Sequence, residues 1–115
     1  WTTLNAVQAF VPHMVEQDWG RIVAVSQPAA LQPAGDASSY AIGKAGQEVL
    51  LLSLAQELRG TGVTANVVLV RAIGEREEGR GSKTTPDEIA STIEYLCSDE
   101  ARMINGARIP AYGRP

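Results

Sequence analysis

The sequence predicts an α/β fold in which helices and strands alternate in the order αβαβαβ and the strands form a parallel sheet. Two runs, residues 21–26 and 63–70, are rich in β-branched residues and apolar at successive positions, the pattern of strands buried on both faces. Each run follows a longer stretch with apolar residues at helical spacing. Residues 1–115, 44% hydrophobic and 20% charged, have the composition of one globular unit.

Composition excludes several functional classes. The net charge is −3 and the basic residues are scattered, so the chain lacks the clustered Lys and Arg of a nucleic-acid or anionic-membrane surface. No apolar run approaches the roughly 18 residues that span a bilayer. The single Cys97 excludes an internal disulfide and fits a reducing cytoplasm, where we expect the protein. The only histidine, His13, is given no role, and no metal site is predicted.

The first element is an amphipathic helix over residues 2–18. Its apolar residues recur at i, i+3, i+4 and i+7, and Gly20 ends it. Pro12 is expected to interrupt and kink this helix, because proline removes a backbone donor and collides with the preceding turn. The chain starts with Trp1 and enters the helical pattern at once, so we expect further polypeptide upstream of it.

The strand at 21–26 leads through a Pro- and Gly-rich loop at 27–37 into a helix over 39–59. This helix is apolar almost all round, so a second helix or a second subunit should pack on the side that the sheet cannot bury. The turn at 60–62 reads Gly-Thr-Gly and, with Ala65, formally matches a dinucleotide fingerprint. We reject the match, because the fingerprint must follow a strand and open a helix, whereas this turn does the reverse.

The remaining residues predict a Gly-rich connection, a helix and a short strand. Residues 71–84 are read either as a lid over the strand ends or as a merely solvated connection. Thr85 is the expected N-cap of a third helix, with Pro86 at its first position and Glu88 closing a capping box. The last strand is expected over 107–112, at a sheet edge because it contains a proline.

Three strands are too few for a free-standing doubly wound sheet. The strand at 21–26 is too apolar to be an exposed edge, so its outer neighbour should be a strand that these residues do not contain. Open α/β sheets bind ligands at the carboxyl ends of their strands. The loops that follow the strands at 21–26 and 63–70 are therefore the expected place for a functional site.

Tyr40 and Lys44 are the residues with the clearest chemistry, at the start of the helix over 39–59. Residues four apart stack on one helix face, so the phenol and the ammonium can share one small volume. A phenol with an unperturbed pKa of about 10 is a poor acid near neutrality, and a cation held beside it stabilises the phenolate. The pair favours acid–base chemistry, with a chance pairing on a surface helix as the alternative.

Several segments together have the residues of a known family: Gly20 to Val23 with Ser26, Tyr40 to Lys44, Leu54-Ala55 with Glu57-Leu58, Val63 to Val68, Glu88 to Ala90, and Leu96 to Ser98 with Asn105-Gly106. On these segments the sequence resembles the carboxyl-terminal half of a short-chain dehydrogenase/reductase, with bacterial 3-oxoacyl-acyl-carrier-protein-reductase-like members as the closest type. The resemblance implies a partial doubly wound, Rossmann-like parallel sheet that lacks its amino-terminal, dinucleotide-binding half.

By this resemblance, the protein is an NAD- or NADP-dependent oxidoreductase that transfers a hydride between nicotinamide and a carbonyl or alcohol substrate. Tyr40 would protonate the carbonyl oxygen, and Lys44 would stabilise the phenolate and hydrogen-bond the nicotinamide ribose. Residues 1–115 would be the substrate-side half, inactive alone because no Gly-rich turn meets a helix N-terminus to hold the pyrophosphate. Family members pair two helices from each subunit in a four-helix bundle, which implies a homo-oligomer through the helices at 2–18 and 39–59.

The family's substrate-binding serine usually lies thirteen residues before the tyrosine, a position that Gln27 occupies here. Ser26 comes one residue earlier. One step along a strand turns a side chain to the opposite face, so Ser26 could serve only if the loop absorbs the offset. The amide of Gln27 could instead donate a hydrogen bond to an oxyanion. Both residues stay candidates for this role.

The segment after the second strand also departs from the family. Val70-Arg71 replaces the usual Pro-Gly. Glu75 lies near the position where the family usually has a threonine that contacts the nicotinamide amide. Arg71 and Ile73 are the candidates for cofactor contact at this strand end. These departures favour a second hypothesis, a non-catalytic dehydrogenase-like subunit or fragment that acts through its paired helices. The intact tyrosine–lysine pair favours the oxidoreductase.

Overall fold

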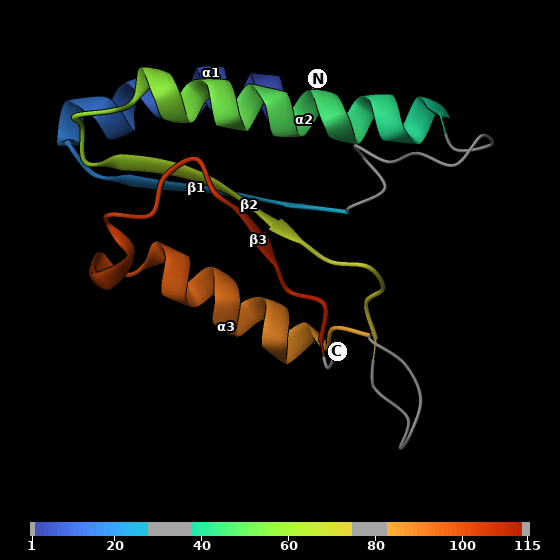
Figure 1. Cartoon of the computed structure of the whole chain (residues 1–115). Helices are drawn as coiled ribbons and strands as arrows, with labels where there is room; N and C mark the ends of the chain where they lie inside the picture. The colour runs from blue at the N-terminus through green and yellow to red at the C-terminus, as the bar shows by residue number, and fades with distance from the viewer. Residues whose placement is uncertain (1, 28–37, 75–82, 114–115) are drawn as a thin grey trace.

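The computed structural model places a three-stranded parallel sheet between two helices on one face and one helix on the other (Figure 1). It describes residues 2–27, 38–74 and 83–113. The elements are α1 (Thr2–Gln17), β1 (Gly20–Ser26), α2 (Ser38–Glu57), β2 (Val63–Leu69), α3 (Pro86–Cys97), the 3₁₀ helix η2 (Asp99–Ala101) and β3 (Arg108–Pro110). The predicted α/β class and parallel sheet are confirmed. None of the helices in these ranges is long and apolar enough to cross a membrane.

β2 is the central strand, and all seven of its residues are buried. Its register with the two neighbours runs from Gly20↔Val63 to Ser26↔Leu69 on one side and from Val67↔Arg108 to Leu69↔Pro110 on the other. β3 forms one edge of the sheet, as its proline predicted, and is shorter than the strand expected over 107–112. The buried strand thus has both hydrogen-bonding edges paired and needs apolar cover on both faces.

β1 forms the other edge of the described sheet. Its side chains at positions 21–23 and 25 are only half-buried, although the sequence has the pattern of a strand buried on both faces. Among the described residues no strand pairs with its outer edge. A neighbouring strand from outside these residues therefore stays a prediction, and the half-buried apolar side chains are consistent with it.

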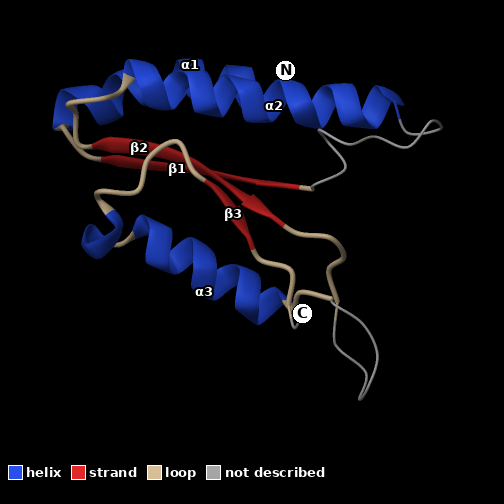
Figure 2. Ribbon diagram, viewed as in Figure 1, coloured by secondary structure: helices blue, strands red, loops and turns tan. Residues whose placement is uncertain are grey.

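Side chains alternate between the two faces of the sheet, and each face has its own helices. On the face of α1 and α2, one cluster joins Ala24, Leu51, Val67 and Leu69, and another joins Leu54, Leu58 and Val63 with Val7, Val11 and Met14. On the opposite face, Val68 and Val70 pack with Leu96 of α3. α1 lies on the same face of the sheet as α2, as Figure 2 shows, and its Val7, Val11 and Met14 join the second of these clusters. The outer side of α2 stays exposed among the described residues, so the cover expected for the side that the sheet cannot bury stays a prediction.

α1 runs without a break through Pro12, so the predicted interruption is wrong. The missing N–H of the proline leaves the carbonyl of Gln8, one turn earlier, without its helical donor. Gln8 and Pro12 both lie on the exposed side of α1, where water can bind this carbonyl. The proline therefore costs the helix one internal hydrogen bond without ending it.

α3 begins as predicted, and both hydrogen bonds of its capping box are present. The Glu88 N–H donates to Thr85 Oγ1 at 3.2 Å, and the Thr85 N–H donates to Glu88 Oε1 at 2.9 Å. The turn at 60–62 leads from α2 into β2, which confirms that it lacks the context of a dinucleotide-binding turn. The predicted lid or connection at 71–84 falls mostly on residues 75–82, which lie outside the described residues.

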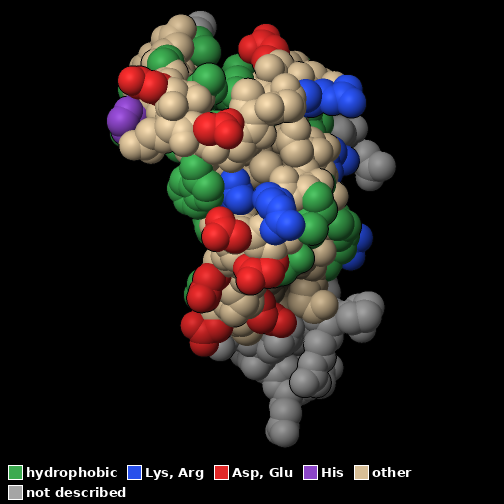
Figure 3. Space-filling view, turned by 90° about the vertical axis from the view of Figure 1, so that its left-hand side faces the viewer, with side chains coloured by type: hydrophobic (Ala, Val, Ile, Leu, Met, Phe, Trp, Pro, Cys, Tyr) green, Lys and Arg blue, Asp and Glu red, His purple; other side chains and the backbone are tan. Residues whose placement is uncertain are grey.

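The amino ends of the strands are tied together by two turns in close contact. The Gly62 N–H donates to Asp18 Oδ1 at 2.7 Å, and a Cβ on Gly62 would lie 1.8 Å from the Asp18 carbonyl oxygen. Arg21 donates to the carbonyls of Gly62 at 3.1 Å and Ser98 at 3.3 Å, so it joins β1 to the start of β2 and the end of α3. Figure 3 looks onto this end of the molecule, where basic side chains lie above a group of acidic ones.

A buried ion pair joins α2 to β3. Glu48 is 1% exposed, and its Oε2 accepts a hydrogen bond from Arg108 Nε at 2.8 Å. Its Oε1 is buried without a hydrogen-bond partner. The carboxylate therefore depends on one guanidinium for compensation of its charge.

Replacing one partner of this pair should cost far more than replacing both. Arg108→Leu is expected to lower the free energy of unfolding by about 3 kcal/mol, because it leaves the Glu48 carboxylate buried and unpaired. The double variant Glu48→Leu/Arg108→Leu should recover most of this loss. Urea unfolding of the protein and both variants measures the difference, and a double variant no more stable than Arg108→Leu would contradict this account.

Candidate active site

Tyr40 and Lys44, on the first turns of α2, line one groove beside the start of α1. This α2 groove has a volume of about 310 Å³ and is lined by Thr2, Thr3, Ser39, Tyr40, Gly43, Lys44 and Gln47. The spacing of four places the phenol and the ammonium on the same face of the helix. Tyr40 is 47% exposed, so a ligand in the groove can reach its ring and hydroxyl. The structure thus brings together the two residues that the sequence predicts to share one volume.

Lys44 is held by two acceptors, one near the carboxyl end of β1 and one on α2 itself. Its Nζ donates to the Val25 carbonyl at 3.2 Å and to Gln47 Oε1 at 3.4 Å. The Ser26 carbonyl accepts from the Val70 N–H and so points toward β2. Successive carbonyls of a strand point to opposite sides, so the Val25 carbonyl points to the outer edge of β1. Lys44 therefore satisfies an edge acceptor that no strand in the described part of the sheet reaches.

The two candidates for the serine role point to different faces of the sheet. Ala24 packs with Leu51 of α2, so alternation turns the side chain of Ser26 toward α2 as well. Ser26 is 1% exposed, and its Oγ has no hydrogen-bond partner. Gln27 follows the strand and is half-buried. Neither residue is among those that line the α2 groove, but Ser26 is the one on the face that carries Lys44.

The candidates after β2 lie apart from the α2 groove. The Arg71 guanidinium stands 4.2 Å from the ring centre of Tyr112, which follows β3. Arg71 thus leans across the end of β2 toward β3 and away from β1. Ile73 forms an isolated parallel bridge with Thr84, and its side chain is mostly exposed. Glu75 lies outside the described residues.

Gln47 and Thr3 also line the groove, and neither was predicted from the sequence as a site residue. Gln47 accepts from Lys44 and, through its Nε2, donates to Thr3 Oγ1 at 2.9 Å. The spacing of three between Lys44 and Gln47 places them on one helix face and was a usable signal. No sequence signal pointed to Thr3, because its contact with Gln47 depends on how α1 packs beside α2.

Comparison with known proteins decides the family. The sequence profile described as "short chain dehydrogenase" matches residues 2–75. The chain belongs to this family. The matched residues run from α1 to the residues after β2 and include every residue of the α2 groove. The resemblance inferred from the sequence motifs is thereby confirmed.

Individual relatives of the chain are about twice as long. Nodulation protein G of Azospirillum brasilense is 31% identical over 124 residues, covering 95% of this chain and 50% of that protein. The 3-oxoacyl-acyl-carrier-protein reductase MabA of Mycobacterium tuberculosis is 31% identical, covering 87% of this chain and 47% of the reductase. The crystal structure of acetoin dehydrogenase YohF from Salmonella typhimurium has a TM-score of 0.84 and 27% identity, covering 96% of this chain and 49% of that one. The chain spans about half the length of the relatives it matches.

The unpartnered hydroxyl of Ser26 makes a test of stability possible. Ser26→Ala is expected to leave the free energy of unfolding unchanged or to raise it by up to about 1 kcal/mol, because it removes a buried polar group that has no hydrogen bond. Thr84→Val is the matched control, since the buried Thr84 hydroxyl donates to the Ala111 carbonyl. The control should lose about 1 kcal/mol. Urea unfolding that shows Ser26→Ala to be the more damaging change would mean that the hydroxyl has a partner.

Proposed function

We propose that the full-length protein containing these residues is an NAD- or NADP-dependent oxidoreductase that transfers a hydride between nicotinamide and a carbonyl or alcohol substrate. In this proposal residues 1–115 form its substrate-side half. The observation that carries the proposal is the placement of Tyr40 and Lys44 in one groove, with Lys44 reaching the carboxyl end of β1. Ligand sites of open α/β sheets lie at this end of the strands.

The described residues suit one end of the dinucleotide better than the other. Lys44 and the hydroxyls of Thr2, Thr3 and Tyr40 are donors and acceptors in one groove, which fits a ribose with its two hydroxyls. No turn in the described residues joins a strand to a helix N-terminus through glycines, as a pyrophosphate site requires. The proposal therefore assigns the nicotinamide ribose to the α2 groove and the pyrophosphate to polypeptide outside these residues.

The two side chains have complementary tasks in this reaction. NAD(P) supplies or accepts the hydride when it is bound. The Tyr40 hydroxyl donates its proton to the carbonyl oxygen as the carbonyl carbon gains the hydride, and it takes the proton back when an alcohol is oxidised. The Lys44 ammonium stabilises the phenolate that Tyr40 becomes. The hydride and the proton thus reach the two ends of the same C=O bond.

The substrate class is supported by the names of the relatives. One is a 3-oxoacyl-acyl-carrier-protein reductase and another an acetoin dehydrogenase, and both names imply a carbonyl or alcohol carbon as the reacting centre. Ser26 shares the α2 side of the sheet with Lys44, but its hydroxyl is buried and does not line the α2 groove, whereas Gln27 is half-buried where β1 ends. We keep both residues as candidates for the group that binds the substrate oxygen.

Tyr40→Phe in the full-length protein is expected to lower kcat by 10²- to 10⁴-fold, roughly the contribution of a well-placed proton donor. Cofactor binding, followed by the fluorescence of NADH or NADPH, should change little. Tyr95→Phe is the control, because Tyr95 is an exposed tyrosine on α3, on the opposite face of the sheet. A Tyr40→Phe enzyme with nearly full kcat would remove Tyr40 from the mechanism.

A second candidate function, self-association without catalysis, is favoured by the outer face of α2. Ile42 and Val49, two turns apart on this helix, are 72% and 58% exposed. Gly46 lies between them, and an added Cβ there would meet no atom within 4 Å. We propose that this open apolar face packs on a second copy of the protein, with α1 beside it. An active enzyme and a non-catalytic subunit would both use this interface.

Ile42→Asp/Val49→Asp is expected to convert an oligomer into a monomer, because two carboxylates would be buried at the interface without partners. Light scattering of the full-length protein measures its mass in solution. Met103→Asp, at an exposed apolar residue outside α1 and α2, should leave the mass unchanged. A monomeric parent protein would contradict the proposed association and, with it, the non-catalytic alternative.

A further inference from the structure

We infer that Gln47 is a positioning residue, which holds the Lys44 ammonium beside Tyr40 and is itself held by Thr3 of α1. This inference rests on the proposed function. Its basis is a chain of three hydrogen bonds: Lys44 Nζ donates to the Val25 carbonyl at 3.2 Å and to Gln47 Oε1 at 3.4 Å, and Gln47 Nε2 donates to Thr3 Oγ1 at 2.9 Å. The chain connects the carboxyl end of β1 to the first turn of α1 through the lysine.

Only one orientation of the Gln47 amide allows hydrogen bonds to both Lys44 and Thr3. An ammonium has three donors and no acceptor, so the side of Gln47 that faces Lys44 must be its oxygen. The amide nitrogen is then turned toward α1, where the Thr3 hydroxyl accepts from it. If the amide were flipped, its NH₂ group would face the Lys44 ammonium, and both groups are hydrogen-bond donors. Lys44 therefore fixes the orientation of the Gln47 amide, and Thr3 holds the side chain by accepting from the nitrogen that is turned toward α1.

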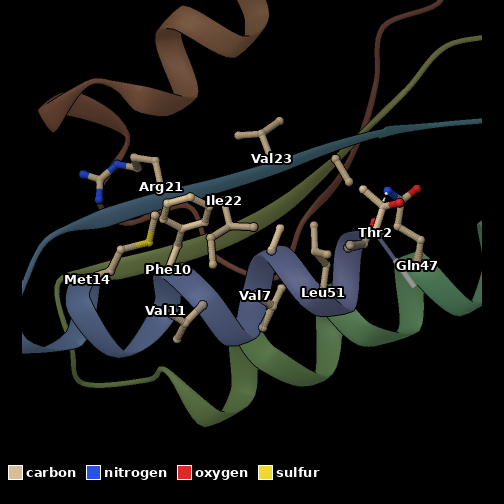
Figure 4. A pocket seen from close by; sticks show the side chains of 13 residues that line it. Thr2, Val7, Phe10, Val11, Met14, Arg21, Ile22, Val23, Gln47 and Leu51 are labelled. Atoms are coloured by element: carbon tan, nitrogen blue, oxygen red, sulfur yellow. Dashed lines mark hydrogen bonds between the residues drawn. The ribbon is translucent and has the colours of Figure 1, made fainter.

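Gln47 also stands at a boundary between two hollows. It lines the α2 groove together with Thr2 and Thr3, and the same three residues line a neighbouring hollow of about 350 Å³. That hollow is otherwise largely apolar, with Val7, Phe10, Val11, Met14 and Leu51 among its walls (Figure 4). An apolar side chain at position 47 could turn into this hollow, and Lys44 would then lose its second acceptor.

The hydrogen bonds to Val25 and Gln47 restrict the placement of the Lys44 side chain. A lysine side chain has four rotatable bonds and one compact charge, so a single hydrogen bond to Val25 leaves many placements of the ammonium. The second acceptor, anchored on another helix, removes most of them. A charge that is already in place when Tyr40 loses its proton contributes to catalysis without a further rearrangement.

The test compares Gln47→Leu with Gln47→Glu in the full-length protein. Gln47→Leu is expected to lower kcat about tenfold, roughly the equilibrium change that one hydrogen bond makes, with the KM of the carbonyl substrate changed less than about twofold. Gln47→Glu keeps an acceptor for Lys44, and the Thr3 hydroxyl can donate to its other oxygen, so it should recover most of the lost kcat. Gln56→Leu, the same change near the other end of α2, is the control and should match the parent.

A second measurement does not depend on turnover. Acylation of lysine amines is read by peptide mass spectrometry. It should be about threefold to tenfold faster at Lys44 in Gln47→Leu than in the parent, because the Lys44 side chain then has one hydrogen bond fewer to break before its amine can meet the reagent. Lys83, the other lysine of these residues, gives the reference rate.

The outcomes separate the two proposals. Parent-like kcat and Lys44 acylation in Gln47→Leu, with only a lower melting temperature, would make Gln47 a structural link between helices and overturn the inference. If Tyr40→Phe also kept its activity, the proposed function would fall as well. Faster acylation of Lys44 in Gln47→Leu, without any turnover in the parent protein, would support the positioning contact while contradicting the oxidoreductase.

Discussion

All seven residues of β2 are buried, and the arrangement of the other elements follows from that burial. The strand pairs with β1 over its whole length and with β3 at Val67–Leu69. Apolar cover must come from helices above and below a strand of this kind. α1 and α2 supply it on one face and α3 on the other. Because α2 must run across the α1 side of the sheet to cover it, its first turns lie where β1 ends. The packing of α2 on the sheet therefore also determines where Tyr40 and Lys44 lie.

The contact between Lys44 and the Val25 carbonyl lies at the β1 edge of the described sheet, where no described strand pairs. A carbonyl oxygen has two lone pairs and can accept from an ammonium and from a backbone N–H together. The tether is therefore compatible with the completed sheet that the proposed oxidoreductase requires. The half-buried side chains of β1 also suit a strand that gains a neighbour.

The sequence predicted those parts of the molecule whose signals are local. Helix periodicity, the buried-strand pattern at residues 63–70 and the capping box at Thr85 each depend on neighbouring residues, and the structure confirms them. Pro12 was misjudged, because the cost of proline depends on whether its freed carbonyl is exposed, which the sequence does not give. Gln47 was missed for a related reason: its partner Thr3 is 44 residues away, and only the packing of α1 on α2 brings them together.

The direction of the Ser26 side chain could be predicted only in part. The sequence showed that it and Gln27 must point to opposite faces, but which face α2 covers was settled by the packing of Ala24 on Leu51. The ion pair between Glu48 and Arg108 was likewise beyond sequence reasoning, because the two residues are 60 positions apart. A glutamate inside an apolar helical stretch gives no indication of which arginine it meets.

The close contact of Gly62 with Asp18, reinforced by Arg21, fastens the strands at the ends opposite to the α2 groove. These contacts join the amino ends of β1 and β2 to the end of α3, and none of them involves a residue of the α2 groove. A substitution in the groove therefore leaves in place the contacts that hold the strand register at this end.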